Sequence, residues 1–165
     1  MSNKALVRDT NGEYQVTQER VSETEILEAA EEIVSLRFAR GQSLSTPEAS
    51  KELFKQKLWT SEQEIFAALY LDNRHRVLGY EPMFYGTIDG ATIHPREVVK
   101  AALRLNAAAV IFGHCHPSGV AEPSMADQTI TRRLKEALSL VDVRVLDHIV
   151  VGGADATSLA ERGLL

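Results

Sequence analysis

Hydrophobic and polar positions follow helical spacing in the first third of the chain. Apolar side chains recur at every third or fourth position across residues 22–41, which predicts an amphipathic helix capped by Ser22 or Thr24 and ended by a glycine. A second helix is predicted to begin at Pro47, since proline is favoured in a first helical turn. Residues 1–20 are polar, and their turn signal at Asn11-Gly12 predicts either a mobile arm or a small strand pair.

From residue 64 the pattern changes to short apolar runs separated by helical segments. Residues 64–71 and 76–87 predict two strands joined by a turn, and Gly79 and Pro82 predict that the second strand is twisted or at an edge. A helix is predicted to begin at Pro95, and its inward-facing positions are Val98, Val99, Ala102 and Leu103.

The last third of the chain repeats this alternation of strands and helices. Residues 107–112 predict a buried strand, a helix starts at Met125, and residues 143–151 predict another strand. Residues 158–165 are expected to form a short terminal helix or a tail. Alternation of this kind predicts an α/β fold, in which helices cover both faces of a mixed β-sheet.

Composition narrows the class of protein. The 165 residues are 44% hydrophobic and 25% charged, as in a soluble globular protein. One cysteine allows no internal disulfide, which fits the cytoplasm, and we find neither a signal peptide nor an apolar run of the roughly 20 residues that span a membrane. The net charge of -5 argues against strong binding to nucleic acid by this chain alone.

Candidate chemistry lies in the segment 113–127. Side chains alternate along a strand, so His114 and His116 project from one side and Cys115 from the other. Asp127 follows at the start of the predicted helix. Two histidines and a carboxylate leave a fourth tetrahedral position open, as in catalytic zinc sites. The alternatives are a chance His-x-His pair and a helix cap formed by Ser124 and Asp127, and the cap is compatible with the ligand role.

The spacing of these residues carries a family resemblance. His-x-His, seven residues, Ser, two residues and Asp resembles the JAMM motif of the MPN-domain metallopeptidases. Pro-Ser-Gly after the second histidine, residues 94–97 and residues 146–152 are similar to the RadC-like branch. The resemblance covers residues 45–165, the expected MPN/JAMM domain with a three-layer α-β-α fold, and leaves residues 1–44 as an N-terminal arm and amphipathic helix.

The resemblance also implies roles for single residues. In the family a zinc-bound water attacks an amide carbonyl, and a glutamate accepts its proton. Glu64 matches the position of that base, and Glu81 on the next strand is the rival. Ser124 matches the serine that helps to hold the developing oxyanion. His114, His116 and Asp127 match the zinc ligands.

Other residues near the motif have structural interpretations. His148, preceded by Asp147, matches a RadC-like signature and is expected to support the site through hydrogen bonds. His94 is expected to be structural. Cys115 departs from the family pattern, in which asparagine usually separates the two histidines, and it is expected to be a small buried residue.

The leading function is therefore zinc-dependent hydrolysis of peptide or isopeptide bonds in a peptide or protein substrate that the sequence does not name. The alternatives are a RadC-type accessory protein in DNA repair or recombination, and a zinc-binding pseudoenzyme. We find no helix-hairpin-helix motif, so a stand-alone member of the branch is expected, and no long insertion that could clamp ubiquitin. The oligomeric state stays open.

Overall fold

The computed structural model describes residues 6–9, 13–17, 20–37, 41, 43–44, 46–86 and 92–165. The chain forms two compact units, residues 1–37 and residues 38–165. In the first unit, β1 (Leu6–Arg8) pairs antiparallel with β2 (Tyr14–Val16), and α1 spans Glu23–Arg37. Ser22 caps this helix, because its hydroxyl oxygen accepts the Glu25 N–H. The predicted turn at Asn11-Gly12 and positions 38–40, which the sequence assigns to the predicted helix, lie outside the described residues.

The second unit is built on a five-stranded mixed sheet in the order β4-β3-β5-β6-β7. The strands are β3 (Ile65–Leu71), β4 (Val77–Tyr85), β5 (Ala109–Cys115), β6 (Arg144–Gly152) and β7 (Asp155–Ser158). Only the β5–β6 pair is parallel. The mixed sheet is as predicted, and β4 lies at an edge, as its glycine and proline indicate.

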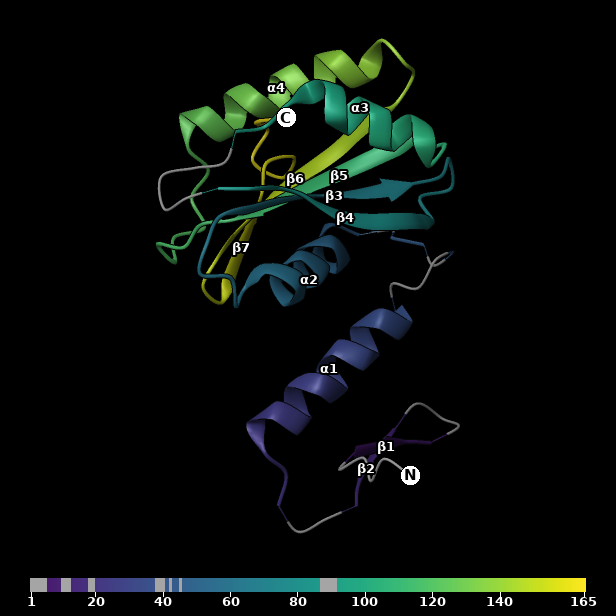
Figure 1. Ribbon diagram of the computed structural model, residues 1–165, viewed down its shortest axis with the longest axis vertical. Coiled ribbons are helices and arrows are strands. Elements are labelled where there is room, and N and C mark those ends of the chain that lie inside the picture. The colour runs from purple at the N-terminus through teal and green to yellow at the C-terminus, as the bar shows by residue number, and fades with distance from the viewer. Residues whose placement is uncertain are drawn as a thin grey trace. The chain divides into compact units, whose positions relative to one another are not determined.

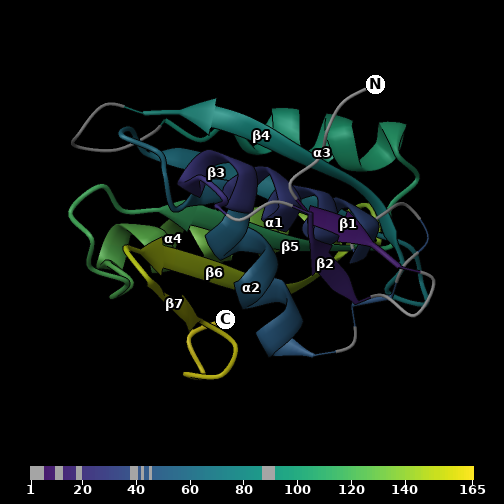
Figure 2. The ribbon, with the colours of Figure 1, turned by 90° about the horizontal axis from the view of Figure 1, so that it is seen from below.

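Helices cover both faces of this sheet and complete the predicted three-layer α-β-α arrangement (Figure 1). On one face lies α2 (Pro47–Leu58), and it contacts β5, β6 and β7. Figure 2 shows this helix from below, lying across the sheet. On the other face lie α3 (Pro95–Arg104) and α4 (Met125–Ser139). No helix in the described part of the chain is both long and apolar enough to cross a membrane.

Alternating side chains of the central strands divide the core into two clusters. The cluster beneath α2 joins Phe54 to Leu69 and Ile111. The cluster beneath α3 and α4 joins Phe66 and Phe112 to apolar residues of both helices. Because the inner strands β3 and β5 are buried on both faces, they are near-continuous apolar runs in the sequence. They form a rigid support for residues at their ends.

One sequence prediction is wrong, because Leu103 is 55% exposed rather than inward-facing. At 100° per residue it lies roughly 140° around α3 from the buried Val98, on the solvent side. Residues 158–165 are expected from the sequence to form a short helix or a tail, and the structure excludes the helix, because Ser158 ends β7 and pairs with Ile149 of β6. Residues 159–163 form turns.

A β-bulge in β6 changes which side chains face α4. The register with β5 shifts from Val110↔Val145 to Ile111↔Asp147, so Leu146 is an extra residue. Beyond the bulge, Asp147 lies opposite Ile111 of the α2 cluster, and the next residue, His148, faces α4. Bulges often redirect a side chain next to a functional site.

Candidate metal centre

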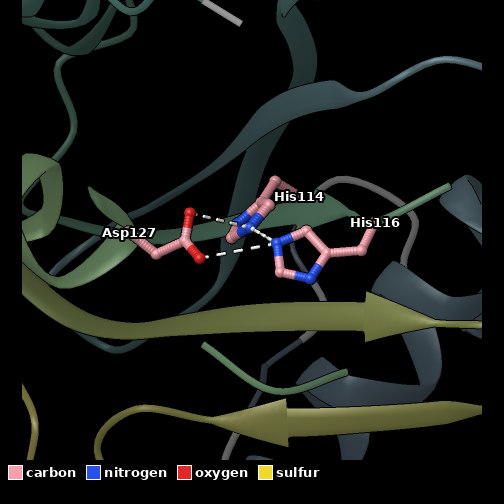
Figure 3. Close-up of side chains that lie close together, drawn as sticks. All are labelled: His114, His116 and Asp127. Carbon is pink, nitrogen blue, oxygen red and sulfur yellow. Dashed lines mark hydrogen bonds and ion pairs between the residues drawn. The ribbon is translucent and has the colours of Figure 1, made fainter. Parts of the chain in front are cut away.

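Three side chains with metal-binding atoms converge where β5 ends and α4 begins (Figure 3). His114 lies in β5, is 1% exposed and faces α4. His116 follows the strand, and its N–H donates to the Val151 carbonyl, which extends the pairing with β6 by one residue. Asp127 is the third residue of α4. The structure thus brings together the three residues that the motif singled out as ligands.

The distances within this cluster suit a shared cation. His114 Nε2 lies 3.1 Å from Asp127 Oδ1, and His116 Nε2 lies 3.4 Å from Asp127 Oδ2. The two Nε2 atoms are 2.9 Å apart. Two imidazole nitrogens and a carboxylate oxygen form a donor set typical of zinc, and three protein ligands leave a position for water or substrate. The cluster therefore fits a divalent transition metal.

A capping box holds Asp127 at the start of α4. The Ser124 hydroxyl oxygen accepts the Asp127 N–H at 3.1 Å, and Asp127 Oδ2 accepts the Ser124 N–H at 2.7 Å. Burial raises the pKa of Asp127, but its close contacts with His114, His116 and Ser124 outweigh the effect of burial and hold this pKa far below its usual range. The predicted cap is present, and it fixes the orientation of the carboxylate.

His116 is oriented by the loop that follows it. Its Nδ1 lies 2.8 Å from the Val120 carbonyl oxygen, which can only accept, so Nδ1 carries the hydrogen. In the neutral ring Nε2 then keeps its lone pair, directed at Asp127. The hydrogen bond with Asp127 raises the pKa of His116, although burial opposes this effect. Without a metal, the Asp127 carboxylate therefore favours a proton at the same nitrogen.

His148 lies behind His114, as the sequence predicts. Its Nε2 is 2.8 Å from His114 Nδ1, and the ring is fully buried and forms T-shaped contacts with Phe66 and Phe112. Burial lowers the pKa of His148 well below its ordinary value, and the neighbouring His114 adds to this effect, so the imidazole is neutral.

Asp147 lies on the opposite face of the sheet from His148. Its carboxylate accepts hydrogen bonds from the Ser158 hydroxyl at 2.6 Å, from the His148 N–H at 2.7 Å and from the Ala160 N–H at 3.0 Å. These bonds tie β6 to β7 and to the turns that follow it. Asp147 therefore supports the fold rather than the metal cluster.

Glu64 lies beside the cluster. The β3–β5 register ends at the pair Phe66 and His114, and continuing it by two residues, to just before β3 and just after β5, would bring Glu64 opposite His116. Residues opposite each other in antiparallel strands point to the same face. The half-buried Glu64 carboxylate contributes to the raised pKa of His116.

Glu81, the rival, is engaged elsewhere. It pairs with Ala68 in the interior of β3, and its carboxylate forms an ion pair with Arg104 of α3 at 2.6 Å. Glu64 is therefore close enough to His116 to influence its pKa, whereas Glu81 is held against Arg104 of α3.

Cys115 and His94 take no part in the cluster. The Cys115 side chain is 4% exposed and packs on the α2 face, as strand alternation predicts. Burial raises the pKa of its thiol. His94 occupies the N-cap position of α3 without a side-chain cap bond and packs edge-on against Phe84.

Thr131 is a site residue that the motifs did not single out. It is fully buried on α4, and its hydroxyl oxygen lies 2.6 Å from His148 Nδ1. The signal that could have found it is a polar residue on an apolar helix face, because Thr131 precedes the buried Leu134 and Leu138 at helical spacing. It also follows Asp127 by one helical turn.

Comparison with known proteins shows the family to which the chain belongs. A family model described as the RadC-like JAB domain matches residues 44–164. Two proteins of Vibrio cholerae, each named UPF0758 protein, are 56% and 54% identical to this chain over 153 and 147 residues. These alignments cover 93% and 89% of this chain, and 96% and 92% of the relatives.

Other relatives are longer. A UPF0758 protein of Nitrosococcus oceani is 60% identical over 126 residues, which are 76% of this chain and 56% of that protein. One of Marinobacter nauticus is 55% identical over 139 residues, or 84% of this chain and 62% of that protein. The chain therefore spans nearly all of the Vibrio relatives and little more than half of these two.

Proposed function

The chain belongs to the family of RadC-like JAB domains, and from this premise we propose that it is a zinc-dependent hydrolase of peptide or isopeptide bonds. The observation that carries the proposal is the convergence of His114, His116 and Asp127, with one donor atom from each within 4.8 Å of the others. We assign the catalytic domain to residues 45–165, and residues 1–44 are an N-terminal arm and helix.

The donor set indicates which residues would hold the metal and what it would supply. A bound zinc ion lowers the pKa of water towards neutrality and polarises a carbonyl group. His114 is buried, whereas the side chains of His116 and Asp127 are 19% and 13% exposed, so the cluster is open to solvent on their side. A peptide or protein substrate would approach from this open side.

Glu64 is the proposed general base. Its electrostatic influence on His116 supports this role, since a base must lie within reach of the water that it deprotonates. The Glu64 carboxylate accepts a proton from the attacking water and returns it to the leaving amine. Because the nitrogen is protonated as the C–N bond breaks, it leaves as a neutral amine.

Ser124 is the proposed oxyanion donor. It is exposed, and it caps α4 beside Asp127, so its hydroxyl lies at the open rim of the cluster. During attack the hydroxyl would donate to the carbonyl oxygen as negative charge develops there. The capping bond uses only a lone pair of the Ser124 oxygen, so capping and donation are compatible.

Metal analysis tests the centre directly. The full chain should bind about one zinc ion, and His114→Ala combined with His116→Ala should abolish binding. A matched control removes two imidazoles elsewhere through His75→Asn and His94→Ala; asparagine suits His75 because its φ is 57°. Unchanged zinc content in the His114/His116 double variant would show that the site is assigned wrongly.

Hydrolysis is tested with a peptide pool and a mass-spectrometric readout. Glu64→Gln preserves shape but cannot accept the proton, so cleavage should fall by ~10²–10⁴ while zinc content is retained. Glu81→Gln is the control, because that carboxylate is paired with Arg104. Equal cleavage by wild type and Glu64→Gln would exclude Glu64, and loss of activity in Glu81→Gln would transfer the role to Glu81.

A further inference from the structure

We propose that Thr131 and His148 are positioning residues that set the tautomer of His114, so that the lone pair of its Nε2 faces the metal position. This inference rests on the proposed metal centre. It concerns which ring nitrogens of His148 and His114 carry hydrogen. These positions follow from one series of hydrogen bonds along the buried face of α4.

The series of hydrogen bonds starts at a backbone carbonyl of α4. Thr131 Oγ1 lies 2.5 Å from the backbone carbonyl oxygen of Asp127, one turn earlier in α4, and donates to it. A carbonyl oxygen can only accept, so this bond uses the single hydroxyl hydrogen of Thr131. The hydroxyl oxygen then has only lone pairs to offer other partners.

His148 must therefore donate to Thr131. Its Nδ1 lies 2.6 Å from Thr131 Oγ1, so the hydrogen of the neutral His148 ring is on Nδ1. The other ring nitrogen, Nε2, keeps a lone pair. It lies 2.8 Å from His114 Nδ1, which must be the donor in that bond. In the neutral His114 ring, Nε2 then carries no hydrogen.

The series of hydrogen bonds therefore starts at the backbone of Asp127 and ends facing the side chain of the same residue. The backbone carbonyl of Asp127 anchors the series, and its carboxylate faces the His114 Nε2 lone pair at the other end. In the neutral His116 ring Nε2 also keeps a lone pair, because the hydrogen lies on Nδ1, which donates to the Val120 carbonyl. Three lone pairs then converge on one point, an arrangement that only a cation or a proton stabilises.

The opposite tautomer of His114 would prevent its Nε2 from binding a metal. With its hydrogen on Nε2, His114 could donate to Asp127 Oδ1, 3.1 Å away, and that nitrogen would be lost as a ligand. The bonds through His148 and Thr131 prevent this arrangement.

Burial protects the relay, which is the series of hydrogen bonds from the Asp127 carbonyl through Thr131 and His148 to His114. Thr131 and His148 are 0% exposed and His114 is 1% exposed, so bulk water offers no alternative partners. Phe66 and Phe112 line the His148 ring. The bulge at Leu146 is what turns His148 towards α4.

The first test uses the wild-type full chain without metal and without an affinity tag. Nitrogen-15 spectra distinguish the protonated from the unprotonated ring nitrogen of a neutral histidine. We expect the hydrogen on Nδ1 in both His114 and His148. A hydrogen on Nε2 of His114 would overturn the proposal.

The second test removes the hydroxyl with Thr131→Val. His148 Nδ1–H then has no acceptor, which favours the tautomer with its hydrogen on Nε2. That nitrogen would donate to His114 Nδ1 and move the His114 hydrogen to Nε2. We expect this switch in the spectra and a ~10–100-fold loss of zinc affinity, measured by competition with a chromophoric chelator.

Two further variants separate the relay from helix stability. Thr131→Ser keeps the hydroxyl and should bind zinc almost as wild type does. Thr129→Val removes the same kind of helix bond, from Thr129 to the Met125 carbonyl, at an exposed position and should leave affinity unchanged. The relay is refuted if Thr131→Val binds zinc as wild type does, or if Thr131→Ser is as weak as Thr131→Val.

The two proposals fail in different ways. If wild type binds no zinc, the metal centre is wrong, whereas the tautomer of His114 is still measured in the metal-free chain. If wild type binds zinc but Thr131→Val binds it equally well, only the relay is wrong. Should Thr131→Val not fold, the wild-type spectra and Thr131→Ser still decide the question.

Discussion

Gly152, the last residue of β6, lies directly against the peptide group of Val120. A Cβ atom on Gly152 would come within 2.3 Å of the Val120 carbonyl carbon, a distance that no real Cβ contact allows. The same carbonyl group accepts the hydrogen bond from His116 Nδ1. Glycine is therefore needed here for space, and its absent side chain lets the loop orient a histidine of the metal cluster.

Gly152→Ala should weaken zinc binding with all three ligands intact. The added methyl group must push the Val120 carbonyl away from His116, which frees the imidazole to rotate, and loss of such support typically costs ~10–100-fold in metal affinity. Chelator competition measures the change. Gly79→Ala is the control, because its Cβ would meet only the Leu105 side chain at 3.4 Å. Equal affinities in the two variants would contradict this prediction.

Asp127→Asn should reduce zinc affinity while preserving the fold. The amide oxygen can still accept the Ser124 N–H of the capping box, but a neutral amide is a poor zinc ligand. Zinc content should therefore fall, while the melting temperature of the metal-free protein should stay close to that of the wild type. Asp155→Asn removes an equal charge at an exposed site on β7 and serves as the control. Full zinc retention in Asp127→Asn would argue against the carboxylate as a ligand.

Zinc affinity should fall as the pH is lowered. The hydrogen bond with Asp127 raises the folded-state pKa of His116 above 6.5, and the added proton occupies Nε2, the atom that would bind metal. This protonation stabilises the metal-free fold below the unfolded pKa, and the gain is lost as pH rises through the folded pKa. Below the raised pKa, affinity should approach a loss of about tenfold per pH unit. Titrations across this range would refute the prediction if affinity stayed constant.

Binding to duplex DNA should be weak. The net charge is -5, and the sequence has no recognisable DNA-binding module, so any affinity should come from local basic side chains and decrease steeply with salt. Fluorescence anisotropy with a labelled duplex at increasing salt measures this. A dissociation constant near nanomolar at physiological salt would instead favour a role in DNA repair or recombination.

Much of the fold and of the candidate site could be predicted because the relevant signals are local. Helical and strand periodicity depends on neighbouring residues, so the elements from β3 to β6 were identified from the sequence. Strand alternation placed His114 and His116 on one side and Cys115 on the other. The interval to Ser124 and Asp127 matched a family motif, and the structure brings these residues to one point.

Contacts between distant segments decided the rest. Glu64 and Glu81 are both candidates because each lies in or next to an apolar segment predicted as a strand, and only the closeness of Glu64 to His116 and the ion pair of Glu81 with Arg104 distinguish their surroundings. Neither feature is visible in local periodicity. The catalytic role of Glu64 stays a prediction.

The partners of His148 likewise come from tertiary structure. The motif singled out this histidine, but the extra residue Leu146 turns it towards α4, and the rotation of that helix brings Thr131 to it. A bulge depends on how two strands pair, and a helix face depends on what it packs against. The sequence by itself therefore determined which residues are candidate metal ligands, whereas the packing of α4 against β6 decided which buried side chains lie within hydrogen-bond distance of them.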